Sequence, residues 1–248
     1  MSHIYWSAST AGDVAVIRSL PHRRRTLTIA GAAQLVEAVN TWSSAEVVPP
    51  LVVELDVDHA ELLEVREMSQ GRPIADWAPW VEAIDALENY PNLVIASVPR
   101  QASCGGLELA LAADVRVARA DATLGLFETR MGILPGCGGT QRLPRLVGPG
   151  HAALLVLSGE PISGERAEQI GLVQEIADDP TEWAIGFAQR CSQNGSDVLI
   201  TAKHALRAAQ SSLADGLRVE GRAFLKLVNQ PTADQHITEW LGGQKESE

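Results

Sequence analysis

The chain of 248 residues is poor in cysteine and in positive charge. Its three cysteines, at positions 104, 137 and 191, are odd in number and lack metal-ligand spacing. We therefore expect no disulfide framework and no metal site, and a reducing compartment such as the cytoplasm. Lysine and arginine total 20 against 31 acidic residues, a net charge of −11. Because nucleic-acid binding requires a basic face, this balance argues against a nucleic-acid partner.

Long apolar runs are also missing. None approaches the roughly 20 residues of a membrane span, and the N-terminus lacks a basic-then-apolar signal pattern, so we expect no membrane partner. One basic cluster stands out, Arg23, Arg24 and Arg25 after His22. It is either a solvated loop or a phosphate-facing patch.

The pattern that is present favours an α/β protein. Apolar residues make up 46% of the chain, enough for a substantial core. Strand-like runs at 14–20, 48–55, 93–98 and 115–118 alternate with helical periodicity at 29–42 and 77–90, around Glu108, and from 139 to 146. This alternation predicts a largely parallel sheet.

The last quarter of the chain differs, because the strand signal fades after Pro180. Residues 182–191, 196–211, 213–228 and 232–241 all have helical periodicity. We therefore predict a core at 1–195 and an all-helical region at 196–248. An apolar stripe in that region either closes over its own domain or contacts another subunit; it comprises Leu199, Leu206, Leu213, Leu217, Phe224 and Leu227.

The most informative segment runs from Ala102 to Asp114, where Gly105 and Gly106 lead into an apolar helix that carries Glu108. Glycines allow close backbone approach, and the first N–H groups of a helix have no partner within it. Glu108 lies about one turn after Gly105, so its carboxylate falls near that helix end. A free N–H can stabilise charge that develops on a carbonyl oxygen, and a carboxylate beside it can transfer a proton. Together they supply two of the groups that an active site for such chemistry needs.

A second glutamate, Glu128, follows 20 positions later in another apolar segment. Other interpretations remain open: Glu108 on an exposed helix face, and Glu128 as a loop carboxylate paired with Arg130. Cys104, at a helix start, is a candidate nucleophile. The Gly136–Thr140 turn is best explained as a cap for the following helix, and Asp114 as a local cap or pairing residue.

These motifs resemble the crotonase (enoyl-CoA hydratase/isomerase) superfamily. The resemblance is carried by residues 94–148, above all the Gly-Gly-Leu-Glu segment, the second glutamate and Gly138-Gly-Thr-Gln-Arg-Leu143, and by Gly171–Ile176. It implies a crotonase-like spiral of ββα units with a C-terminal helical oligomerisation region, assembled as a trimer or hexamer. It also implies that Glu108 and Glu128 are the catalytic pair and that Gly105 supplies one N–H of an oxyanion hole.

The chain departs from the family pattern at its substrate contacts. Segment 59–68 lacks the glycine of the usual second oxyanion loop, and its alignment puts Leu63 at the donating position. We also predict Ala60, Gly106, Phe127 and the arginine cluster among the substrate contacts. Two elements that usually touch the adenine of coenzyme A are reduced or missing. The thioester carrier is therefore either coenzyme A or the phosphopantetheine arm of an acyl carrier protein.

The resemblance implies a lyase that adds or removes water across the double bond of an enoyl thioester, as in fatty acid metabolism, without a separate cofactor. Isomerisation or decarboxylation of a related thioester, with carrier-linked chains in a polyketide pathway, is the alternative enzymatic hypothesis. A structural or activating subunit that keeps the fold without catalysis is the alternative from another class.

Overall fold

The computed structural model describes residues 5–20, 28–57, 62–71, 73–230, 232–235 and 237–238. The chain divides into two compact units, Met1–Gln193 and Asn194–Glu248. The strands are β1 (Trp6–Ala11), β2 (Val14–Ser19), β3 (Leu51–Glu54), β4 (Val94–Val98), β5 (Gln101–Ser103), β6 (Val115–Ala118), β7 (Thr123–Gly125), β8 (Ile162–Ser163) and β9 (Glu175–Ile176). The helices are α1 (Ile29–Ser43), α2 (Leu62–Ser69), α3 (Ala78–Glu88), α4 (Gly105–Ala112), α5 (Gly139–Ser158), α6 (Gly164–Gln169), α7 (Pro180–Ser192), α8 (Ser196–Ala208) and α9 (Leu213–Val228), with short 3₁₀ turns η1 (Ile74–Trp77) and η2 (Glu128–Met131).

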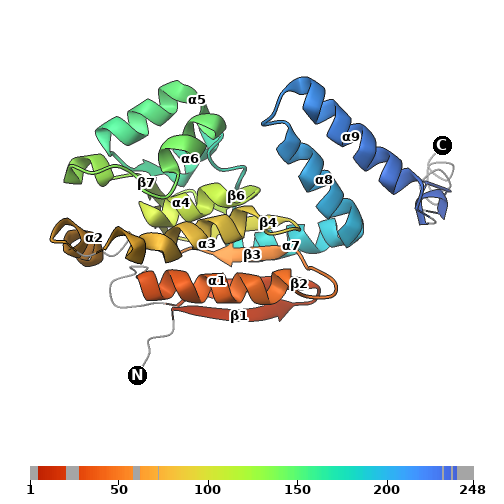
Figure 1. Cartoon of the computed structure of the whole chain (residues 1–248), viewed down its shortest axis with the longest axis horizontal. Coiled ribbons are helices and arrows are strands. Elements are labelled where there is room, and N and C mark those ends of the chain that lie inside the picture. The colour runs from red at the N-terminus through yellow and green to blue at the C-terminus, as the bar shows by residue number, and fades with distance from the viewer. Residues whose placement is uncertain are drawn as a thin grey trace. The chain divides into compact units, whose positions relative to one another are not determined.

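The first unit is built on two mixed sheets (Figure 1). The larger has the strand order β1-β2-β3-β4-β6-β9, in which only the β1–β2 hairpin is antiparallel. The smaller has the order β5-β7-β8, with β5 parallel to β7. The runs β4–β5–α4 and β6–β7–η2–α5 each give one strand to each sheet before a helix, which is the expected ββα repeat.

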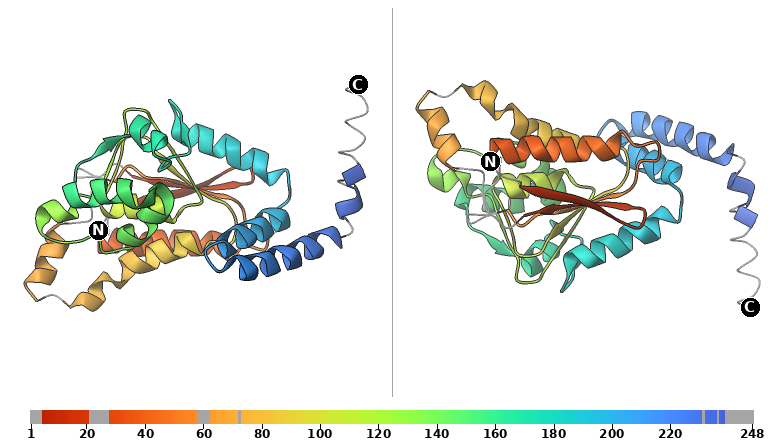
Figure 2. Two further views of the ribbon diagram at one scale, coloured as in Figure 1. Left: turned by 90° about the horizontal axis from the view of Figure 1, so that it is seen from above. Right: turned by 90° about the horizontal axis from the view of Figure 1, so that it is seen from below.

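Alternation along the strands decides which helices cover the large sheet. In β2, Val14 and Val16 face α7 and contact its Ala184 and Ala188, whereas Ala15 and Ile17 join the main core. The main core also contains the buried residues of α1, α3 and α4. Figure 2 shows the resulting layers, with α1 and α3 on one side of the sheet and α7 on the other. The large sheet therefore has buried apolar side chains on both of its faces.

Most expected elements are confirmed, and the differences have local causes. The helix predicted at 139–146 continues to Ser158, because the chain turns at Gly148 (φ 77°) and restarts as a helix at Pro149. The strands β5, β7, β8 and β9 contain only two or three residues and give no period-2 signal. Asp114 was expected to cap or pair locally, but its Oδ2 accepts the Val94 N–H at 2.8 Å, from a residue 20 positions earlier in the chain.

The second unit is a helical pair, α8 and α9, followed by further helical residues at 232–235 and 237–238. No residue of α9 is buried, and its exposed side chains include Leu213, Leu217, Phe224 and Leu225. Whether this face mediates assembly stays a prediction. Among the helices of the described ranges, none is both long and apolar enough to cross a membrane.

Candidate active site

The turn into α4 is shaped by close packing against its two glycines. A Cβ on Gly105 would lie 2.6 Å from the Trp80 ring, and one on Gly106 would lie 2.7 Å from the carbonyl oxygen of Val57. Neither distance is compatible with a side chain. Gly105 is the first residue of α4, so its N–H has no acceptor within the helix.

Glu108 is buried in this helix and bonded to the backbone of a distant turn. Its side chain is 2% exposed, and its Oε1 accepts N–H bonds from Cys137 at 2.8 Å and Gly139 at 2.7 Å. Burial raises the pKa of Glu108 to about 7, and the nearby Glu128 adds to the rise. The two N–H bonds and Arg142 act in the opposite direction. The carboxyl therefore titrates near neutral pH, which suits proton transfer.

The turn that holds Glu108 precedes α5 and is itself anchored. Gly138, the residue before the helix, has φ 99°, which favours glycine. Arg142 donates to the Cys137 carbonyl oxygen at 2.9 Å and forms an ion pair with Glu88 of α3. The segment does cap the helix, as the sequence suggested. It also positions Glu108, which the sequence did not reveal.

Glu128 begins η2, directly after β7, and is also buried, at 6% exposure. Burial raises the pKa of its carboxyl as well. Its Oε2 has no hydrogen-bond partner among the described residues. An exposed loop carboxylate would not show this burial, and the candidate partner Arg130 is itself exposed. Two carboxyls with raised proton affinity therefore share one site.

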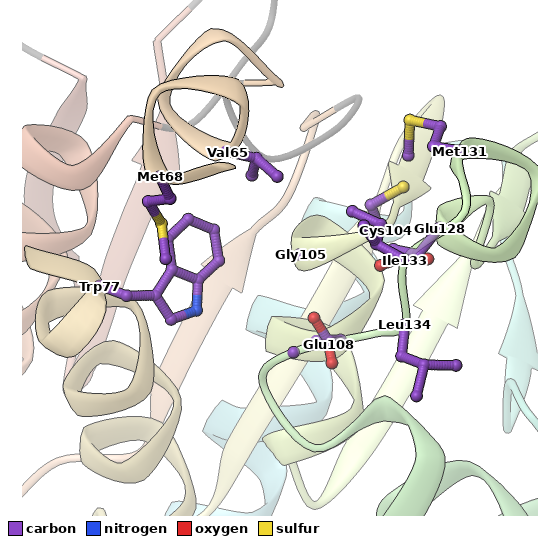
Figure 3. A pocket seen from close by; sticks show the side chains of 11 residues that line it. Val65, Met68, Trp77, Cys104, Gly105, Glu108, Glu128, Met131, Ile133 and Leu134 are labelled. Carbon is purple, nitrogen blue, oxygen red and sulfur yellow. The ribbon is translucent and has the colours of Figure 1, made fainter. Parts of the chain in front are cut away.

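Both carboxyls line a pocket of about 300 Å³ (Figure 3). We define its carboxylate wall as Gly105, Glu108, Glu128 and Gly136, and its apolar wall as Val65, Met68 and Trp77. The other lining residues are Cys104, Met131, Ile133 and Leu134. The pocket thus combines two acids with a mostly apolar lining.

The apolar wall comes from α2 and η1. The α2 helix is tied to the start of α1, where the Ile29 N–H donates to Glu64 Oε2 at 2.9 Å. Trp77 stacks on Trp80 with ring centroids 5.5 Å apart, and Trp80 in turn packs on Gly105. Leu63 is the second residue of α2, so its N–H also lies in a first turn without an intrahelical acceptor. Its role as the second oxyanion donor stays a prediction.

The other predicted substrate contacts are not seen at the pocket among the described residues. Arg23, Arg24, Arg25 and Ala60 lie outside the described residues. Gly106 packs on Val57 rather than lining the pocket, and Phe127 places its ring against Gly125. Their contacts with a substrate stay predictions.

Sequence reasoning missed Val65, Met68 and Trp77 as pocket residues, and also Met131, Ile133 and Leu134. No local signal marks them, because apolar residues at helical spacing are equally typical of a core. The nucleophile interpretation of Cys104 loses support, since burial and Glu128 raise the pKa of its thiol to about 12. The described ranges contain no cluster of three or more residues suited to hold a metal ion.

Comparison with known proteins identifies the family of the chain. The enoyl-CoA hydratase/isomerase family model matches residues 61–245. The chain is 39% identical over 180 residues to the 2,3-dehydroadipyl-CoA hydratase of Escherichia coli, an alignment covering 71% of this chain and 69% of that protein. It is 32% identical over 241 residues to the mitochondrial enoyl-CoA hydratase domain-containing protein 2 of Bos taurus, covering 90% and 79%.

The structural similarity extends over nearly the whole chain. A solved enoyl-CoA hydratase from Bacillus anthracis superposes with a TM-score of 0.87 at 28% identity, covering 96% of each chain. The chain therefore belongs to the enoyl-CoA hydratase/isomerase (crotonase) superfamily, a family of enzymes. The aligned sequence spans 58% of one Bacillus subtilis relative, 69% of the Escherichia coli hydratase and 65% of a second Bacillus subtilis relative.

Proposed function

We propose that this protein is a hydratase that adds water across the double bond of an enoyl-CoA thioester and catalyses the reverse dehydration. The observation that carries the proposal is the pair of buried carboxyls, Glu108 and Glu128, in one pocket beside the first N–H of α4. Burial raises the pKa of both, which suits one acid and one base at neutral pH.

The proposed reaction uses each group once. The thioester carbonyl oxygen accepts hydrogen bonds from the N–H groups of Gly105 and Leu63, which stabilise the charge that develops on it. One carboxylate takes a proton from water as the water oxygen bonds to Cβ, and the π electrons move to the carbonyl oxygen. The other carboxyl gives its proton to Cα as the carbonyl re-forms. Atoms and charges balance without a separate cofactor.

We propose coenzyme A as the thioester carrier, because the names of the relatives given above refer to coenzyme A thioesters. The mostly apolar pocket lining favours an apolar acyl group next to the thioester. A pantetheine thioester tests the carrier. A kcat/KM at least ~100-fold higher for acyl-CoA, about 2.7 kcal/mol, supports coenzyme A, and a ratio near one supports a carrier protein. Replacing Arg23, Arg24 and Arg25 with glutamine tests whether the basic cluster contributes to the difference.

We further propose a trimer or hexamer assembled through the helical unit. The support is the row of apolar side chains on α9, which includes Leu213, Leu217, Phe224 and Leu225. The mass in solution tests it, because a monomer has 26.5 kDa. An active monomer would contradict the proposal.

The decisive assay incubates the protein with crotonyl-CoA and follows the loss of enoyl absorbance. Loss of absorbance with a 3-hydroxyacyl-CoA product supports hydration. A shifted double bond would identify an isomerase, and a protein that turns over neither enoyl-CoA nor carrier-linked enoyl chains would be a non-catalytic subunit.

A further inference from the structure

Cys104 adopts a backbone conformation that costs energy for any residue except glycine. In the described part of the chain, it is the one non-glycine residue with positive φ, at φ 51° and ψ −125°. Backbone hydrogen bonds on both sides of Cys104 hold this conformation. The Cys104 N–H donates to the Gly125 carbonyl oxygen at 2.9 Å, and its own carbonyl oxygen accepts the Glu108 N–H at 3.0 Å. A glycine would relieve this strain, so the cysteine side chain calls for an explanation.

The thiol is directed to the active site instead of to the helix. Cys104 holds the N-cap position of α4, yet its side chain makes no capping hydrogen bond. It is 3% exposed and lines the pocket beside Glu128 (Figure 3). The thiol and the Glu128 carboxyl line the same pocket, and each shifts the pKa of the other.

Few groups stabilise the ionised form of Glu128. Among the described residues, the titratable groups that act on the carboxyl or are acted on by it are Cys104, Glu108 and Cys137. Glu108 repels it. Against the effect of burial, a backbone hydrogen bond lowers the pKa of Glu128, and the thiol of Cys104 is the side-chain group that lowers it further. Oε2 meanwhile remains without a hydrogen-bond partner among the described residues.

We propose that Cys104 is a positioning residue whose thiol donates a hydrogen bond to the Glu128 carboxylate and holds its unpartnered oxygen toward the substrate. The proposal rests on the proposed role of Glu128 in proton transfer. The strained backbone is then the cost of placing a donor where the first turn of α4 meets η2. The raised pKa of the thiol fits a donor that stays protonated at neutral pH.

Three variants separate the effect of the thiol donor from the effect of the strained backbone: Cys104→Ala, Cys104→Gly and Cys104→Ser. Losing one hydrogen bond, worth about 0.5 to 1.5 kcal/mol, should lower kcat up to ~10-fold in the alanine and glycine variants, with KM unchanged. The pH–rate profile should move to higher pH, because the ionised pair is less stabilised. Serine keeps a donor and should restore part of kcat. Cys191→Ala, on α7 away from the pocket, is the control and should match wild type.

Thermal stability further separates the loss of the thiol donor from the relief of backbone strain at position 104. Glycine accepts φ 51° without strain, so Cys104→Gly should melt at a higher temperature than Cys104→Ala while being equally impaired in catalysis. A glycine variant with wild-type kcat and an unshifted pH profile would overturn the proposal. So would a serine variant no better than alanine.

An infrared titration tests the contact without any activity. The protonated-carboxyl band of Glu128 is identified by its loss in Glu128→Gln, and its midpoint should rise in Cys104→Ala relative to wild type. An unchanged midpoint refutes the contact. A raised midpoint in a protein that turns over no enoyl thioester would leave the contact standing and refute the proposed function instead.

Discussion

The two walls of the pocket are held in different ways. The carboxylate wall depends on backbone: two N–H groups bond to Glu108, and Gly105 sits against a tryptophan ring with no room for a Cβ. The apolar wall depends on side chains, with α2 tied to α1 through Glu64 and Trp77 stacked on Trp80. Two backbone N–H bonds hold the Glu108 carboxyl, whereas one N–H bond and a ring stack hold the apolar wall. The carboxylate wall carries the proposed acid and base, and the apolar wall the proposed contacts with the acyl group.

The largest effect is expected from the two glutamates of the carboxylate wall. Glu108→Gln and Glu128→Gln should each lower kcat for hydration by ~10²–10⁴-fold, the usual contribution of a general acid or base. The double variant should lose much less than the product of the two, because both groups act on one water. Steady-state kinetics with crotonyl-CoA measures this. Two fully active single variants would end the hydratase proposal.

The helix α2, which carries Val65 and Met68 of the apolar wall, is tested through the backbone of Leu63. Leu63→Pro deletes the proposed donor in the first turn of α2, where proline is tolerated. We expect kcat to fall by ~10²–10³-fold, as for the loss of one oxyanion donor. Leu62→Pro deletes the neighbouring N–H and is the matched control. Equal losses in both variants would point to a damaged helix, and no loss in either would contradict Leu63 as an oxyanion donor.

The burial of Glu108 predicts a pH-dependent stability. Its pKa is about 7 in the folded protein against an ordinary value of 4.5. The folded protein therefore binds this proton more tightly than the unfolded chain does. The resulting stability is complete below pH 4.5 and is lost as the pH rises toward 7. Between these limits the wild type should lose up to about 3 kcal/mol of unfolding free energy more than Glu108→Gln. Urea unfolding across this range measures the difference, and parallel curves would contradict it.

The smallest effect is expected from Arg142, which holds the turn behind Glu108. Arg142→Gln removes the bond to the Cys137 carbonyl and the pair with Glu88, and should lower kcat by ~10-fold while raising the pKa of Glu108. Arg145→Gln, on the exposed side of the same helix, is the control and should leave kcat unchanged. If Arg142→Gln matches the control, the turn is held by its glycines alone.

Sequence reasoning predicted the carboxylate wall better than the apolar one. Gly105, Glu108 and Glu128 lie within 24 residues and carry a specific spacing, and the structure brings them to one pocket. Trp77 and Met68 lie more than 25 residues before Gly105, and no motif in the sequence links them to it. Their place depends on how α2 and η1 pack, which no local pattern specifies.

The sequence by itself determined the family, the alternation of strands and helices, and the two glutamates behind their glycine turn, because spacing and residue type are local properties. Only the tertiary structure decided what surrounds those glutamates: which amides bond to Glu108, that Glu128 keeps an oxygen without a partner among the described residues, and that Cys104 accepts a strained φ beside it. The physical reason is that burial and hydrogen bonding, which set the pKa of a carboxyl, come from segments that are distant along the chain.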